Sequence, residues 1–159
     1  MSKAEKYRLL ERQVAALVEG ETDTIAKMAN VAAVLHETFG FWWTGFYRVV
    51  GSVGEPVEPP SPHRELVLGP FQGPVACMHI PFGKGVCGTA WKRNETVVVP
   101  DVEEFPGHIA CSSASKSEIV VPVHGVAGEV TAVLDIDSDR LATFDEIDKV
   151  WLERIVTLL

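Results

Sequence analysis

The first forty residues have hydrophobic side chains at helical spacing. In residues 2–19 the apolar positions form one stripe, and Ser2 with Glu5 has the form of a capping box. A second stripe runs through residues 22–39, and a glycine follows each segment, where glycine commonly ends a helix. This pattern predicts two amphipathic helices in succession.

From Trp43 onward the spacing of apolar residues changes to two, which is typical of strands. The segments with this pattern are WTGFYRVV, ELVLGPF, CMHIPF, TVVVPD, EIVVPV and GEVTAVLDIDS. A short helix is predicted in VCGTAWKRN, and residues 51–64 are rich in Pro and Gly, as expected of a surface loop. Residues 103–116 lack either period and are predicted to be a long functional loop.

The chain ends in a further helical pattern at residues 143–158. Thr143 and Glu146 suggest a capping box. The predicted buried stripe consists of Phe144, Ile147, Val150, Trp151, Ile155 and Leu158. Helices that flank a run of mostly antiparallel strands indicate an α+β fold, and we expect residues 1–159 to form a single domain.

Two of the predicted strands carry carboxylates on the same face. Side chains alternate along a strand, so Asp135 and Asp137 point one way while Val130, Ala132, Leu134 and Ile136 point the other. If residues 118–123 pair with this strand as a hairpin, Glu118 joins the two aspartates. A solvated sheet face is the simpler alternative, but Val120 and Val133 lie on the same face, which favours a pocket.

Three crowded carboxylates cannot all remain ionised at low cost, so one is expected to hold a proton near neutral pH. Such a group could bind an ammonium ion and also donate a proton. On the strand at 43–50, Trp43 and Tyr47 share one face. They could form the wall of a site for an apolar or S-methyl group, or be two core aromatic residues.

Charge and composition narrow the classes of function. The 159 residues carry a net charge of −8, with an estimated pI of about 5.1, which argues against nucleic acid as the main partner. The sequence contains no apolar run long enough for a membrane span, and its charged N-terminus does not resemble a signal peptide. We therefore expect a cytoplasmic protein.

The three cysteines are an odd number, which indicates free or redox-active thiols in a reducing compartment. Free cysteines are often inert core residues, but the surroundings of Cys111, ACSSAS, show no core period and argue against that for Cys111. Cys87 lies just inside a predicted helix N-terminus, where the helix dipole favours the thiolate. A zinc site from Cys77, His79, His108 and Cys111 matches no standard spacing, so no metal is predicted.

Four blocks of the sequence resemble the free methionine-(R)-sulfoxide reductases, which are built on a GAF domain. The blocks are WTGFYR, GPFQGPVACMHIPFGKGVCGTAW, HIACSSASKSEIVVPV and VLDIDS, and the resemblance extends over residues 20–158. It implies that the chain reduces free methionine sulfoxide by thiol chemistry, with no cofactor, and that thioredoxin is the external reductant.

The resemblance also implies roles for individual residues. Cys111 would be the nucleophile, Cys77 the usual resolving cysteine and Cys87 an auxiliary resolver. Glu118, Asp135 and Asp137 would be pocket carboxylates, with Glu118 or Asp137 as proton donor and Asp135 as partner of the substrate ammonium. Trp43 and Tyr47 would line the substrate site. The Pro-rich segment 51–64 is longer than expected for the family.

Two other functions remain open on the sequence alone. A non-catalytic GAF domain that senses a small ligand would share the fold, and a thiol redox switch would share the cysteines. The sequence does not fix an oligomeric state, although the first helix is a candidate surface for a homodimer.

Overall fold

The computed structural model describes residues 1–51, 64–109 and 114–159. Its first two helices are α1 (Lys3–Val18) and α2 (Thr24–Phe39). The predicted capping box is confirmed: the Ser2 side chain accepts from the Glu5 N–H, and the Glu5 carboxylate accepts from the Ser2 N–H. Gly40 ends α2 in the left-handed conformation, at φ +66°, which glycine adopts without strain.

A six-stranded antiparallel sheet forms the centre of the molecule. Its strands are β1 (Trp43–Val50), β2 (Glu65–Gln72), β3 (His79–Pro81), β4 (Val97–Val99), β5 (Ser117–His124) and β6 (Val130–Ser138). Their order across the sheet is β3-β2-β1-β6-β5-β4, and every neighbouring pair is antiparallel. The predicted α+β class with a mostly antiparallel sheet is confirmed.

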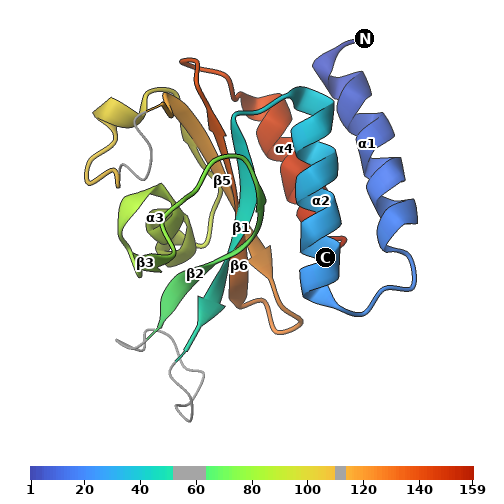
Figure 1. Cartoon of the computed structure of the whole chain (residues 1–159), viewed down its shortest axis with the longest axis horizontal. Coiled ribbons are helices and arrows are strands. Elements are labelled where there is room, and N and C mark those ends of the chain that lie inside the picture. Colours follow the sequence, from blue (N-terminus) through green and yellow to red (C-terminus); the bar gives the residue numbers. More distant parts are fainter. Residues whose placement is uncertain (52–63, 110–113) are drawn as a thin grey trace.

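Helices α2 and α4 (Glu146–Val156) cover one face of this sheet, and α1 packs against these two helices on the outside (Figure 1). The cluster between them is apolar and includes fully buried side chains from the strands, such as Phe46, Ile119, Leu134 and Ile136. Burial of this apolar area supplies the main stabilisation of this layer. None of the helices in the described part of the chain has both the length and the apolar character that a membrane span requires.

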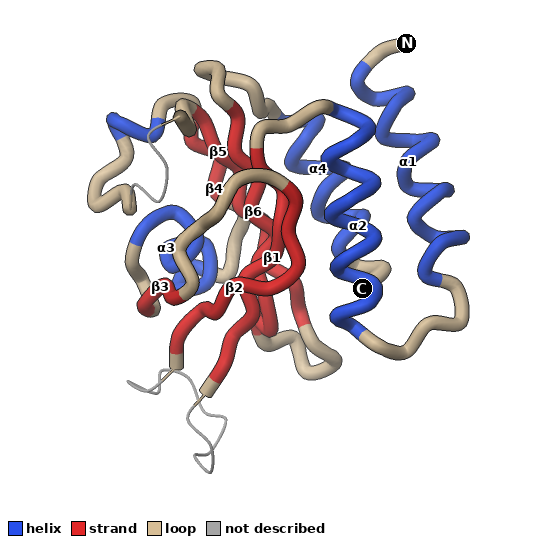
Figure 2. Tube along the Cα trace, viewed as in Figure 1, coloured by secondary structure: helices blue, strands red, loops and turns tan. Residues whose placement is uncertain are grey.

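The opposite face carries α3 (Gly85–Arg93) and the short 3₁₀ helix η1 (Val102–Glu104), which Figure 2 shows on the other side of the strands, and α3 also contacts the edge strand β3. A second apolar cluster fills this side. Its members include Trp43, Tyr47, Val86, Cys87, Trp91, Val120 and Val133. The prediction that Val120 and Val133 share the carboxylate face is therefore confirmed, and this face holds the candidate site.

The predicted start of the last helix is wrong, and so are two members of its predicted buried stripe. Phe144 and Ile155 are buried, and Trp151 and Leu158 pack against the core, as predicted. Asp145 caps α4, with its carboxylate accepting from Ile147 and Asp148 N–H, whereas the Thr143 hydroxyl donates to Ser138 Oγ. Because the register of the helix is set by its packing, Ile147 (42% exposed) and Val150 (46% exposed) face solvent. The buried residues of α4 are Asp148, Leu152, Ile155 and Val156.

Val130 also lies on the face opposite to the one predicted. The pairing of β5 with β6 shifts by one residue between Val123 and His124, so that His124 pairs with Val130. Because a bulge of this kind reverses the alternation on one side of it, Val130 packs against the site-side cluster rather than the helices.

Candidate active site

The register of the sheet brings the three predicted carboxylates together. Glu118 on β5 lies directly opposite Asp137 on β6, and Asp137 lies opposite Trp43 on β1. Asp135 occupies the next row on the same face, opposite Val120 and Gly45. The predicted grouping of Glu118, Asp135 and Asp137 is thus confirmed as a matter of position, while their roles in catalysis stay a prediction.

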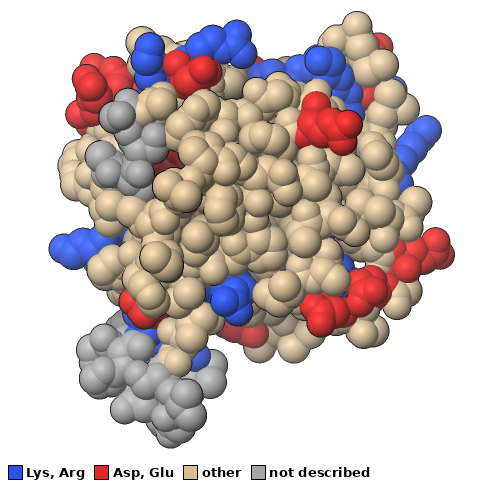
Figure 3. All heavy atoms as spheres, viewed as in Figure 1, with Lys and Arg blue, Asp and Glu red and all other residues tan. Residues whose placement is uncertain are grey.

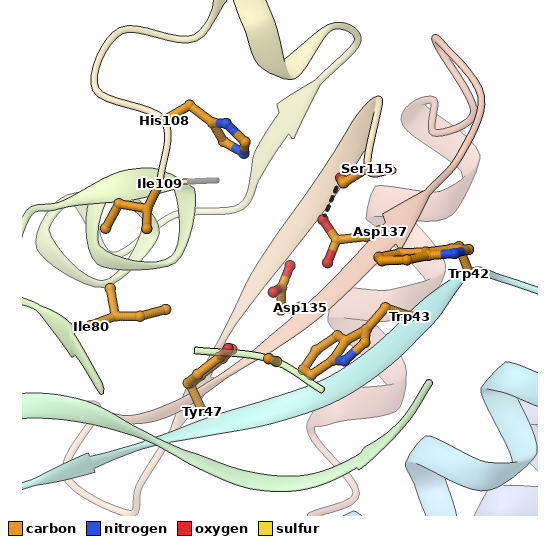
Figure 4. Close-up of a pocket in the computed structure, with 10 residues that line it drawn as sticks. Trp42, Trp43, Tyr47, Ile80, His108, Ile109, Ser115, Asp135 and Asp137 are labelled. Carbon is orange, nitrogen blue, oxygen red and sulfur yellow. Dashed lines mark hydrogen bonds between the residues drawn. The ribbon is translucent and has the colours of Figure 1, made fainter. Parts of the chain in front are cut away.

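A cavity of about 50 Å³ opens onto this group. Asp135 and Asp137 extend into it from β6, Trp43 and Tyr47 from β1, and His108 closes it from the loop on the far side (Figure 4). The remaining lining residues are Trp42, Ala76, Ile80, Ile109 and Ser115. The mixture of apolar walls and convergent carboxylates is typical of a small-molecule site.

Burial raises the pKa of these carboxyl groups and so favours their protonated forms. Glu118 is 6% exposed, and loss of solvation raises its pKa well above the ordinary value of 4.5; the charges on Asp135 and Asp137 raise it further. The pKa of Asp137 is also raised well above its ordinary value by burial and by Asp135, although the Ser115 hydroxyl donates to its Oδ1 at 2.9 Å and opposes the shift. Protons are therefore retained here near neutral pH.

Asp135 differs from its two neighbours. Burial raises its pKa above the ordinary value, but hydrogen bonds from Glu118 and Cys87 oppose the shift and stabilise the carboxylate. Its Oδ1 atom is buried and finds no hydrogen-bond partner among the described residues. A buried anionic oxygen without a donor is costly, so this atom calls for a ligand that carries one.

The raised pKa values have a consequence for stability. Glu118 stabilises the fold fully below its unfolded pKa, near 4.5, and this contribution is lost as pH rises through its higher folded pKa. Between pH 5 and pH 8 the free energy of unfolding of the unsubstituted protein should therefore fall as pH rises. In Glu118→Gln, which has no proton to lose at this position, the fall should be smaller. The two slopes should differ by up to about 1.4 kcal/mol per pH unit, the value for one proton. Urea unfolding at several pH values measures this; parallel curves would contradict it.

Trp43 and Tyr47 are both core residues and pocket walls. They are 3% and 2% exposed, and their rings are 5.9 Å apart between centroids. The Trp43 Nε1 donates to the Pro74 carbonyl, and the Tyr47 hydroxyl donates to the Cys77 carbonyl. Both aromatic side chains are thus fixed in orientation before any ligand binds.

Gly45 lies between these two rings along β1, and the Trp43 ring lies against it. A Cβ atom there would come within 2.6 Å of Trp43 Cη2 and 2.4 Å of Phe71 Cβ. We expect Gly45→Ala to displace Trp43, to destabilise the fold by about 1–3 kcal/mol and to weaken ligand binding. Gly51→Ala, where the nearest atom is 3.6 Å away, is the control in denaturant unfolding. Equal midpoints for the two variants would rule out this role for Gly45.

The cysteines occupy different environments. Cys87 is a free, buried thiol in the first turn of α3, and burial, together with the nearby carboxylates, raises its pKa well above the ordinary value of 9.0. The expected thiolate at Cys87 is therefore wrong, because loss of solvation outweighs the helix dipole. Cys77 is partly exposed and disulfide-bonded. Cys111, the predicted nucleophile, lies outside the described residues, as do residues 52–63 of the Pro-rich segment.

Several pocket residues carried no clear signal in the sequence. Ser115 lies on the small-residue segment beside Cys111, and its contact with Asp137 is visible only in the structure. The sequence suggests His108 only as a zinc ligand, yet its Nε2 lies 3.9 Å from Glu118 Oε1, and burial lowers its pKa. The other histidine of that zinc proposal, His79, contacts Glu65 instead, at 2.8 Å.

Cys87, Glu118 and Asp135 have ligand atoms within 4.8 Å of one another, which is the spacing of a cation site. A metal ion would require the thiol and both carboxyls to be deprotonated. The pKa values of Cys87 and Glu118 are raised well above their ordinary values, so both side chains hold their protons near neutral pH. The group therefore favours a cation that binds without removing the protons from Cys87 and Glu118. An ammonium group that contacts Asp135 meets this condition.

Comparisons with known proteins place the chain in a family. The GAF domain family matches residues 22–159. GAF domain-containing protein A of Dictyostelium discoideum is 52% identical over 99% of this chain and 92% of its own length. Free methionine-R-sulfoxide reductase of Escherichia coli is 43% identical over 100% and 89% of the two chains.

A solved structure has a similar fold. The free methionine-R-sulfoxide reductase of Neisseria meningitidis, solved in complex with its substrate, is 50% identical to this chain. The match covers 99% of this chain and 88% of that one, with a TM-score of 0.88. With relatives of this identity over nearly the whole length, the chain belongs to the free methionine-R-sulfoxide reductase family of GAF-domain proteins.

Proposed function

We propose that this protein reduces free L-methionine-(R)-sulfoxide to L-methionine by thiol chemistry. The observation that carries the proposal is the buried Oδ1 of Asp135, which lacks a donor among the described residues and belongs to a group of three carboxyls. Relatives with the name of this enzyme support the same activity. A sensor without catalysis would not need the cysteines beside such a group.

The substrate is a zwitterion with a polar S=O group, and each part has a counterpart in the pocket. Its ammonium group donates to the Asp135 carboxylate in a charge-assisted hydrogen bond. Its S-methyl group packs on Trp43, with Tyr47 behind it, as sulfur and methyl groups do on aromatic rings. A methionine sulfoxide within a peptide lacks the ammonium group and is therefore selected against.

In the chemical step, a thiolate at Cys111 attacks the sulfoxide sulfur. The S–O bond breaks, the substrate sulfur gains two electrons, and the oxygen passes to Cys111 as a sulfenic acid after it accepts one proton. Asp137 is our candidate donor, because it lines the cavity and its raised pKa keeps a proton available near neutral pH. Glu118, the alternative donor, is not among the lining residues and acts on Asp135.

Recycling requires a second thiol. The sulfenic acid at Cys111 condenses with the Cys77 thiol, releases water and forms a disulfide, which thioredoxin reduces by exchange in a reducing cytoplasm. The disulfide at Cys77, together with the free thiol at Cys87, supports Cys77 as the resolving residue. Cys87 is then an auxiliary thiol at most, and no cofactor is needed beyond the external dithiol.

The proposal is tested with racemic free methionine sulfoxide and dithiothreitol. The protein should consume the R epimer and form an equal amount of methionine, as followed by chiral chromatography, while the S epimer remains. If neither epimer is consumed, the protein is not this reductase. Consumption of both epimers at similar rates would contradict the shaped pocket.

A further inference from the structure

The loop between β2 and β3 presents apolar side chains to solvent on both sides of Cys77. Val75 is 88% exposed and Met78 is 68% exposed. Single exposed apolar residues are common on protein surfaces. Here, however, two of them flank a partly exposed cysteine that is disulfide-bonded. The apolar surface of Val75 and Met78 is small, but its position beside a disulfide-bonded cysteine points to a function.

The backbone of this loop is anchored to the sheet. The Pro74 carbonyl accepts from Trp43 Nε1 at 3.0 Å, and the Cys77 carbonyl accepts from the Tyr47 hydroxyl at 2.9 Å. The Met78 carbonyl accepts from the Leu68 N–H at 2.9 Å. The exposed side chains therefore belong to a segment that is held in place, so a partner would not have to order it at an entropic cost.

The same loop offers free backbone donors. Within the described part of the chain, no hydrogen bond involves the N–H groups of Val75 or Ala76. Unpaired backbone N–H groups can pair with the backbone of another protein, while neighbouring side chains supply the apolar contacts. Val75 and Met78 are exposed apolar side chains that can make these apolar contacts.

The segment that forms the loop and most of the preceding strand carries no charged side chain. Residues 66–78, LVLGPFQGPVACM, contain no charged side chain. The loop arches in front of β1 in Figure 1, and the corresponding face in Figure 3 carries its charged groups mostly around the margin. An uncharged, small and anchored patch suits the limited contact area of a transient redox complex.

We propose that Val75 and Met78 form the docking surface for a protein dithiol reductant of the thioredoxin class, an inference that rests on the proposed function. A thiolate of the reductant attacks Cys77 Sγ, the protein's disulfide breaks, and Cys111 leaves as a thiolate and takes up a proton. The second thiol of the reductant then attacks the mixed disulfide and releases Cys77 as a thiol. Two electrons pass from the dithiol, which becomes a disulfide.

The test uses two reductants and the double variant Val75→Asp/Met78→Asp. With thioredoxin, thioredoxin reductase and NADPH, we expect kcat/KM for thioredoxin to fall by roughly tenfold or more, because aspartates replace apolar contacts. With dithiothreitol, which needs no docking surface, the rate should match that of the unsubstituted protein. Val126→Asp, at a fully exposed valine in the β5–β6 turn, is the matched control and should behave normally.

A trapping experiment tests docking without sulfoxide turnover. The disulfide form of the protein is mixed with a thioredoxin that has lost its second cysteine, and the mixed disulfide is located by peptide mapping. We expect it at Cys77, with slower formation in the double variant. Normal thioredoxin kinetics in that variant, an equal loss with dithiothreitol, or trapping at another cysteine would overturn the docking surface. Trapping at Cys77 without turnover of methionine sulfoxide would instead overturn the proposed function alone.

Discussion

Replacement of Cys111 with serine is expected to reduce methionine formation by about 10³-fold or more, because a hydroxyl at this position is a far weaker nucleophile than a thiolate. The measurement is the dithiothreitol-driven assay with the R epimer. Isothermal titration calorimetry serves as the control: Cys111→Ser should still bind the substrate, because the carboxylate group is intact. A variant that turns over normally would show that Cys111 is not the nucleophile.

The matched variant Cys77→Ser separates the first chemical step from recycling. It should form about one methionine per protein molecule in a rapid phase and then stall with thioredoxin, because no disulfide can form. Steady turnover with thioredoxin at the unsubstituted rate would assign the resolving role to another thiol, for which Cys87 is the remaining candidate.

The second large effect is expected for Asp135→Asn. The substitution preserves the shape of the side chain but removes the anion that we assign to the substrate ammonium. The lost contact is a hydrogen bond to a charged group, of about 1.5–3 kcal/mol, so we expect kcat/KM to fall on the order of 10²-fold, mainly through KM. Steady-state kinetics with the R epimer measures this.

Asp139→Asn is the control for that variant, because Asp139 follows β6 by one residue and is exposed. Its kinetics should match those of the unsubstituted protein. Asp135→Asn should also keep the fold, since it removes one charge from a crowded buried group. If Asp135→Asn leaves KM unchanged, the ammonium contact has been assigned to the wrong residue.

Most of the fold and the grouping of the carboxylates could be predicted from local patterns. The alternation of side chains in residues 118–123 and 131–137 placed Glu118, Asp135 and Asp137 on one face, because the hairpin between β5 and β6 keeps its register over those positions. The prediction failed at Val130, beyond the point where that register shifts. A bulge leaves no clear mark in an alternating sequence.

Other features depended on contacts between distant segments. Helix α4 is capped by Asp145 and not by Thr143. Lys3, from the opposite end of the chain, contacts both Asp145 and Asp148 at this cap. The burial of Cys87 among carboxylates arises because α3 packs on β5 and β6, and its effect on the pKa outweighs the local helix dipole. Ser115 and His108 likewise reach the pocket only through tertiary packing.

The recognition of a free amino acid by Asp135 is the claim on which the account depends most. It is tested by comparing kcat/KM for free L-methionine-(R)-sulfoxide with that for its N-acetyl derivative, which has the same sulfoxide but no ammonium group. We predict that the free amino acid is preferred on the order of 10²-fold, and that this preference largely disappears in Asp135→Asn. Equal values of kcat/KM for the two compounds with the unsubstituted protein would contradict the account.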